Sequence, residues 1–134
     1  MNDTFSISRE LGDDKNKITN ITLQSNIDET NATIKNNIYA SKAVTLNIIN
    51  LTTTGSVFGS GTINVVGLKA NRFSGQILAG GGILNITGGT YTTRYVAGGT
   101  YNNNSTEDSS ITIKGTTDRT SFSGTIYGGN IAEG

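Results

Sequence analysis

The chain has 134 residues with ten basic and ten acidic side chains, so its formal net charge at pH 7 is zero. This length fits one domain, and the balanced charge excludes the basic surface by which proteins bind nucleic acid or anionic membranes. The absence of cysteine excludes disulfides and thiolate metal sites, and the absence of histidine removes the usual general base and the commonest metal ligand.

Gly, Ser, Thr and Asn make up half of the residues, and the apolar residues are mainly β-branched. Isoleucine and valine placed regularly in a polar sequence favour many short strands over a disordered linker. No window carries apolar residues at helical spacing, and no stretch approaches the roughly 18 apolar residues of a transmembrane helix. We therefore expect an all-β chain with no membrane-inserted segment.

The first part of the chain is polar and charged, and we expect residues 1–17 to form a polar lead-in or an N-terminal cap. Its start lacks the basic and apolar regions of a secretion signal, so the chain is either cytoplasmic or a piece of a longer exported protein, and we favour the second. A repeat domain is expected over 18–134. It starts with Ile21-Thr22-Leu23 and Thr33-Ile34-Lys35, which we interpret as a degenerate first pair of two recurring phrases.

Two short phrases then alternate four times along the chain. The first phrase places one polar residue between two apolar ones: Leu46-Asn47-Ile48, Ile63-Asn64-Val65, Leu84-Asn85-Ile86 and Ile111-Thr112-Ile113. The second phrase ends in small residues, mainly glycine: Ser56-Val57-Phe58-Gly59, Gln76-Ile77-Leu78-Ala79-Gly80, Tyr95-Val96-Ala97-Gly98-Gly99 and Thr125-Ile126-Tyr127-Gly128-Gly129. An echo, Phe73-Ser74-Gly75 and Phe122-Ser123-Gly124, precedes the second phrase in two coils.

The spacing of the phrases predicts a solenoid. The middle residues of the first phrase, starting from Thr22, are 25, 17, 21 and 27 residues apart, and those of the second, starting from Ile34, are 23, 20, 19 and 30 apart. Repeats of roughly 20–50 residues are typical of solenoids, and loops that protrude from a constant rung explain the uneven steps. The longest step contains the polar run 102–108, which we expect to form such a loop.

We predict a right-handed parallel β-helix of about four to five coils. Alternate residues of each strand point inward, so the apolar residues fill the core while Asn and Thr face outward and form ladders from coil to coil. The Gly-Gly pairs are expected at corners. An antiparallel β-sandwich is the alternative, but stacking explains the regular alternation of two phrases more directly.

Several of these segments resemble the repeats of large bacterial surface proteins, including the passenger domains of autotransporter-type adhesins. The resemblance covers roughly residues 44–134 and rests on Gly88-Gly89-Thr90-Tyr91, Tyr95-Val96-Ala97-Gly98-Gly99, Ser110-Ile111-Thr112-Ile113-Lys114-Gly115 and Gly124-Thr125-Ile126-Tyr127-Gly128-Gly129. It implies an exported β-helical stalk or adhesin segment at the bacterial cell surface. It provides no catalytic residues to transfer to this chain.

Tests for chemistry yield no catalytic, cofactor-binding or metal-binding residues. The glycine-rich stretch 59–64 has Asn64 where a dinucleotide fingerprint needs its third glycine, and a strand is expected to follow it. The acidic pairs are adjacent in sequence, so in a strand their side chains would point to opposite faces instead of forming a glycosidase pair. These pairs are Asp13 with Asp14, Asp28 with Glu29, and Glu107 with Asp108.

Candidate partner-binding residues cluster around the longest step. Three tyrosines and an arginine could stack on a sugar ring or an aromatic side chain, and the polar run beside them could vary without disturbing the core. The candidates are Tyr91, Arg94, Tyr95, Tyr101, Asn102, Asn103, Asn104, Glu107 and Asp108.

The sequence thus favours a non-enzymatic, extracellular stalk or adhesin segment that attaches to a host glycan or a matrix protein. A self-assembling filament subunit is the alternative, because a β-helix exposes unpaired strand edges at its ends. A carbohydrate-active β-helix, such as a phage tail-spike or lyase fragment, is a third hypothesis. An activity screen on polysaccharides with Glu107→Gln and Asp108→Asn controls tests it.

Overall fold

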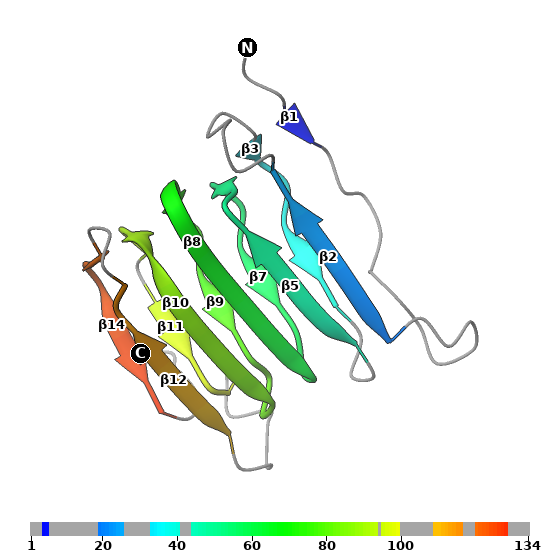
Figure 1. The fold of residues 1–134 in the computed structure, drawn as a ribbon. Helices are drawn as coiled ribbons and strands as arrows, with labels where there is room; N and C mark the ends of the chain where they lie inside the picture. Colours follow the sequence, from blue (N-terminus) through cyan, green and yellow to red (C-terminus); the bar gives the residue numbers. More distant parts are fainter. Residues whose placement is uncertain are drawn as a thin grey trace.

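The computed structural model describes residues 4–5, 19–25, 33–40, 44–93, 95–99, 109–116 and 120–128. These residues contain no helix, hence none that could cross a bilayer, and every strand pairing among them is parallel. The chain winds so that successive coils stack strands in three columns, which we call the first, second and third ladders (Figure 1). The predicted parallel β-helix is confirmed, and the described strands exclude an antiparallel sandwich.

The first ladder carries the first phrase and lies across the front of Figure 1. Its inward residues are β-branched or leucine, as the alternation in the sequence predicts. Those of β5, β8 and β10 are buried in the coil, whereas those of the two end strands, β2 and β12, are half-buried or exposed. The outward residues between them are half-buried or exposed. The ladder consists of β2 (Asn20–Gln24), β5 (Thr45–Ile49), the first part of β8 (Thr62–Phe73), the first part of β10 (Ile83–Tyr91) and β12 (Ser110–Lys114).

A column of asparagine amides runs up the outer face of the first ladder. The register places Thr22, Asn47, Asn64, Asn85 and Thr112 above one another. Each amide donates to the amide oxygen one coil below: the Asn64 Nδ2–Asn47 Oδ1 and Asn85 Nδ2–Asn64 Oδ1 distances are both 2.9 Å. The predicted side-chain ladder is therefore present, and it links coils independently of the backbone.

Replacing Asn64 by alanine is expected to lower the free energy of unfolding by about 1–2 kcal/mol, because Asn64 makes one ladder hydrogen bond in each direction. Urea denaturation followed by circular dichroism measures this change. The control Thr112→Ala alters the exposed upper end of the same column and should cost less than about 0.5 kcal/mol. Equal losses for the two variants would show that the amide column does not stabilise the fold.

The second ladder brings three aromatic rings together inside the coil. Ile34, Thr53, Phe73, Tyr91 and Phe122 share one register position. The Tyr91 ring stacks between those of Phe73 and Phe122, with centroid distances of 5.7 and 5.6 Å. The echo seen in the sequence is thus one structural position. The ladder consists of β1 (Thr4–Phe5), β3 (Thr33–Ile34), β6 (Thr52–Thr53), the ends of β8 and β10, and β13 (Ser121–Phe122).

The third ladder carries the second phrase and corrects one interpretation. Ile38 pairs with Val57, so the first member of the second phrase is Ile38-Tyr39 and the interpretation of Ile34 was wrong. Ile34 pairs instead with Thr53 in the second ladder. Each coil thus contributes a third strand, which lies between the strands of the first and second phrases. The ladder consists of β4 (Ile38–Tyr39), β7 (Val57–Phe58), β9 (Ile77–Leu78), β11 (Tyr95–Ala97) and β14 (Thr125–Tyr127).

Most of the uneven spacing arises at the corners on either side of the first ladder. In β8, residues 68–71 stand opposite Gly89 alone, because Gly67 pairs with Gly88 and Arg72 pairs with Thr90. Five strands stack in the third ladder. The described strands form a solenoid of about 3 turns, somewhat fewer than the predicted four to five coils.

Candidate functional site

Apolar and aromatic side chains line the outside of the third ladder. The inward residue of each of the first four strands is fully buried, and the next residue points outward because side chains alternate in a strand. The register places these outward residues in one line. We call this line the outer row; it consists of Tyr39, Phe58, Leu78, Ala97 and Tyr127.

The first two residues of the outer row form an exposed aromatic platform. The rings of Tyr39 and Phe58 are nearly parallel, at 9°, with centroids 4.9 Å apart, and Tyr39 keeps 48% of its surface exposed. A shallow hollow of about 320 Å³ opens beside them. It is lined by Tyr39, Ala40, Phe58, Gly59 and Ser60.

The middle of the outer row is an apolar cluster outside the main core. Leu78 and Ala97 are only 2% and 0% exposed although they point away from the coil. Phe58, Tyr95 and Tyr127 pack against them. The rings of Tyr95 and Tyr127 meet edge to face, with centroids 5.6 Å apart. The row is thus a continuous line of apolar side chains, exposed at Tyr39, buried at Leu78 and Ala97, and with an aromatic ring at each end.

A polar edge accompanies the platform. The Asn37 amide donates to the Tyr39 hydroxyl over 3.4 Å, while the Asn37 Oδ1 accepts a 2.9 Å bond from the backbone N–H of Ser56. The second bond fixes which way the exposed amide points. An aromatic ring with an oriented amide at its edge can bind a ligand that has one apolar and one hydroxyl-bearing face.

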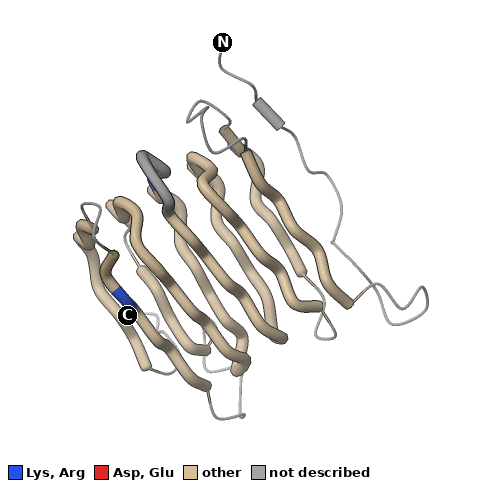
Figure 2. The backbone as a smooth tube through the Cα atoms, in the orientation of Figure 1, with Lys and Arg blue, Asp and Glu red and all other residues tan. Residues whose placement is uncertain are grey.

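The described surface is almost free of charge. The charged residues with described side chains are Lys35, Arg72 and Lys114, and all ten acidic residues lie outside the described part of the chain (Figure 2). The platform residues themselves are uncharged. All five residues of the outer row are likewise uncharged.

The predicted partner-binding residues separate into three groups. Tyr91 is 1% exposed in the core stack, so its ring is removed from the set that could contact a partner. Tyr95 lies on β11, two residues before Ala97 of the outer row, and is half-buried against Tyr127. The other predicted residues lie outside the described residues: Arg94, Tyr101, Asn102, Asn103, Asn104, Glu107 and Asp108.

The sequence interpretation missed Tyr39, Phe58, Leu78 and Tyr127. A signal was present, since each second phrase has an apolar or aromatic residue directly after its β-branched residue. In a short strand these two residues must face opposite sides, so one of them lies outside the coil. The sequence interpretation placed the glycines of the second phrase at corners and did not assign an orientation to the residue after the β-branched one.

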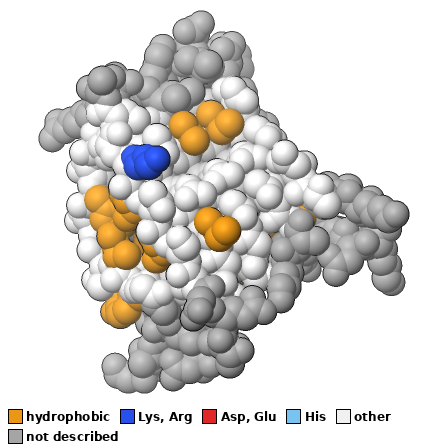
Figure 3. All heavy atoms as spheres, turned by 60° about the horizontal axis from the view of Figure 1, so that its bottom comes forward, with side chains coloured by type: hydrophobic (Ala, Val, Ile, Leu, Met, Phe, Trp, Pro, Cys, Tyr) orange, Lys and Arg blue, Asp and Glu red, His pale blue; other side chains and the backbone are white. Residues whose placement is uncertain are grey.

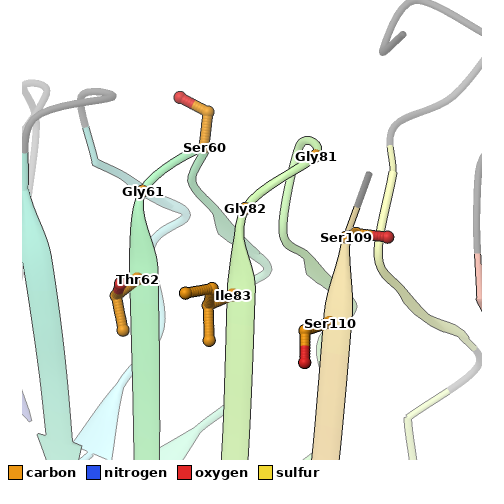
Figure 4. Close-up of a pocket in the computed structure, with 8 residues that line it drawn as sticks. All are labelled: Ser60, Gly61, Thr62, Gly81, Gly82, Ile83, Ser109 and Ser110. Atoms are coloured by element: carbon orange, nitrogen blue, oxygen red, sulfur yellow. The ribbon is translucent and has the colours of Figure 1, made fainter. Parts of the chain in front are cut away.

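A second hollow of about 430 Å³ lies at the glycine-rich corner where β8, β10 and β12 begin (Figure 4). Its floor is backbone, and the N–H groups of Gly81, Gly82 and Ile83 already donate to the carbonyls of Gly98, Ala79 and Gly61. These donors are unavailable for a phosphate. These three N–H groups therefore have a structural role at the corner. Its lining comprises Ser60, Gly61, Thr62, Gly81, Gly82, Ile83, Ser109 and Ser110.

The described residues contain no cluster of acidic, histidine or cysteine side chains that could hold a metal ion. The acidic pairs considered for glycoside cleavage, from Asp13 to Asp108, all lie outside the described ranges. No protein-family model, curated protein or solved structure matches this chain. The outer row is therefore the candidate site on its own geometry.

Proposed function

We propose that this chain is a non-enzymatic segment of a secreted or cell-surface attachment protein, in which a stiff β-helical stalk presents the Tyr39–Phe58 platform to a neutral glycan. The observation that carries the proposal is the exposed Tyr39–Phe58 platform on the side of a continuously stacked coil. The autotransporter-type phrases in the sequence support the same assignment.

A stalk must resist extension and shearing between its coils. Three parallel ladders, the Asn47–Asn64–Asn85 amide column and the stack around Tyr91 all connect one coil to the next. These contacts repeat along the axis, so each coil is supported by its neighbours. The arrangement supports a structural role for the coil and leaves its side faces for binding.

A neutral glycan fits the chemistry of the platform. The apolar C–H face of a sugar can pack on an aromatic ring, and the ring's negative face attracts those weakly positive hydrogens. The Asn37 amide beside the ring offers hydrogen bonds to sugar hydroxyls. Without a described carboxylate or a cluster of cations nearby, the platform has no basis for preferring an anionic polymer.

Replacing Tyr39 and Phe58 together by alanine is expected to weaken glycan binding at least tenfold, which is about 1.4 kcal/mol. Affinity electrophoresis through gels that contain a soluble neutral β-glucan or galactomannan measures this change, with an anionic polysaccharide gel for comparison. The control Ile113→Ala removes a similarly exposed apolar side chain from β12, outside the platform, and should bind like the parent chain.

Retention by the neutral glycans that is unaffected by the double substitution would place the binding site elsewhere. Binding to a collagen-coated surface without any glycan retention would retain the attachment role and replace the glycan by a matrix protein. Release of reducing ends from either polysaccharide would contradict the non-enzymatic assignment and favour the carbohydrate-active alternative.

A further inference from the structure

An exposed isoleucine interrupts a polar column on the outside of the first ladder. Asn20, Thr45, Thr62, Ile83 and Ser110 share one outward register position. Ile83 is 45% exposed, although its neighbour Leu84 is fully buried in the core. The column therefore offers an apolar side chain at its surface, with a hydroxyl-bearing residue in the coil on either side.

Ile83 lies in the hollow of about 430 Å³ at the glycine-rich corner. The side chains of Thr62, Ile83 and Ser110 follow one another along this hollow, and that of Ser60 projects away from the strands (Figure 4). All four are half-buried or exposed, so their hydroxyls and the isoleucine can contact one ligand.

Ser60 connects this hollow to the platform. It lines both the 430 Å³ hollow and the 320 Å³ hollow beside Tyr39 and Phe58. The two hollows therefore meet at the corner between the third and first ladders, and we call them together the corner groove. The corner groove extends over four successive corners of the coil, which hold Ala40, Ser60, Gly82 and Ser109.

The surface around the corner groove is mainly polar. Figure 3 turns toward the viewer the side of the molecule where β8, β10 and β12 begin, which is the bottom of Figure 1. Separate hydrophobic patches interrupt a surface of polar side chains and backbone there. The described residues that line the corner groove are uncharged. This surface fits a neutral, hydroxyl-rich ligand that has apolar faces of its own.

We propose that the corner groove binds an extended, neutral oligosaccharide whose chain runs along the coil axis, with one sugar on the Tyr39–Phe58 platform and another on Ile83. This inference rests on the glycan binding proposed above and extends it from one sugar to a chain segment. Strands in a sheet lie about 4.7–4.9 Å apart, so four successive corners span roughly 14 Å. An extended β-linked hexose chain advances by a similar distance per sugar, so sugars and coils keep step over this length.

Hydroxyl groups provide the polar contacts in the second hollow. The backbone N–H groups of Gly81, Gly82 and Ile83 are bound within the coil. The side chains of Ser60, Thr62 and Ser110 supply hydroxyls, which both donate and accept hydrogen bonds, as sugar hydroxyls do. Ile83 lies between Thr62 and Ser110 in register and packs against the apolar C–H face of the sugar.

Titration calorimetry with linear β-linked glucose and mannose oligosaccharides, from the disaccharide to the hexasaccharide, tests the corner groove. The affinity of the parent chain is expected to rise at least tenfold from the disaccharide to the tetrasaccharide, because the longer ligand occupies both hollows at once. It should then level off, because further sugars extend beyond the groove.

Ile83→Ala is expected to weaken binding of the hexasaccharide about fivefold and to leave binding of the disaccharide unchanged. Thr62→Val removes one hydroxyl at nearly constant shape and should give a smaller loss with the same length dependence. The control Ile113→Ala removes an exposed isoleucine from the next coil, outside both hollows, and should bind all lengths like the parent chain.

The outcomes separate this inference from the proposed function. Equal affinity for short and long oligosaccharides would overturn the corner groove, even where replacing Tyr39 and Phe58 still weakens binding. A hexasaccharide that binds Ile83→Ala as tightly as the parent chain would overturn it as well. Failure of every oligosaccharide to bind, or binding that is unaffected by the platform substitutions, would contradict the proposed function itself and with it this extension.

Discussion

Replacing Gly75 by alanine is expected to lower the free energy of unfolding by about 3 kcal/mol or more. Gly75 lies at the corner between the second and third ladders, directly above Gly55 of the preceding coil. A Cβ at Gly75 would overlap the carbonyl carbon and oxygen of Gly55. The backbone N–H groups on either side of Gly55 are hydrogen-bonded to the coil below, that of Thr54 to the Ile34 carbonyl and that of Ser56 to the Asn37 side chain. Since neither backbone can move without separating the coils, the added methyl group breaks the stacking locally. Urea denaturation followed by circular dichroism measures the loss.

Gly128→Ala and Gly115→Ala are the matched controls. A Cβ at Gly128 meets no atom within 4 Å, and one at Gly115 comes no nearer than 3.9 Å to the Thr120 hydroxyl. Both substitutions should change the free energy of unfolding by less than about 0.5 kcal/mol. If Gly75→Ala were as stable as these two, the close approach of successive coils at this corner would be refuted.

The same corner shows why glycine is needed there. Phe73 and Ile77 are four residues apart, whereas Tyr91 and Val96, at the equivalent positions one coil later, are five apart. The longer corner contains no glycine, and its buried Thr93 donates a 3.0 Å hydrogen bond to the Tyr95 carbonyl. We infer that the extra residue gives Thr93 the space that the shorter corner lacks.

Replacing Tyr91 by alanine is expected to cost about 3–5 kcal/mol, the range for removing a buried aromatic ring. Tyr91 is the middle ring of the stack with Phe73 and Phe122, so its loss leaves a void that both neighbouring rings line. A compensating movement is restricted, because Phe73 and Tyr91 are held in register by paired strands. The measurement is again chemical denaturation, with tyrosine fluorescence as a second probe.

Tyr39→Ala provides the comparison for this prediction. It removes the same ring from the exposed platform, where one stacked contact with Phe58 is lost and no internal void forms. We expect a cost of about 1 kcal/mol or less. Similar costs for the two tyrosines would contradict the assignment of Tyr91 to the core.

Local pattern was enough to predict the first ladder. The residues around Asn47, Asn64 and Asn85 have an unambiguous period of two, and the structure pairs them in the predicted register with their amides in a column. A one-residue slip would turn every apolar side chain outward, so the register is fixed by the pattern itself. The corner role of the glycines followed from the same reasoning.

The candidate site could not be derived in this way. The strands of the third ladder are mostly two residues long, too short for a period to show, and the second ladder has strands as short as Thr52–Thr53. Short strands are specified by their neighbours above and below, not by their own sequence. For this reason Ile34 was interpreted in place of Ile38, and the outer row was missed.

The sequence by itself determined that this chain is all-β, that its coils stack in parallel and which residues of the first ladder face the core, because alternation and repeat length are local properties. Only the tertiary structure decided that each coil has three strands, that Tyr91 is buried while Tyr39 is exposed, and that Ile113 and Ile126 occupy uncovered core positions. These depend on which coil lies against which, and burial is set by those neighbours and not by residue type.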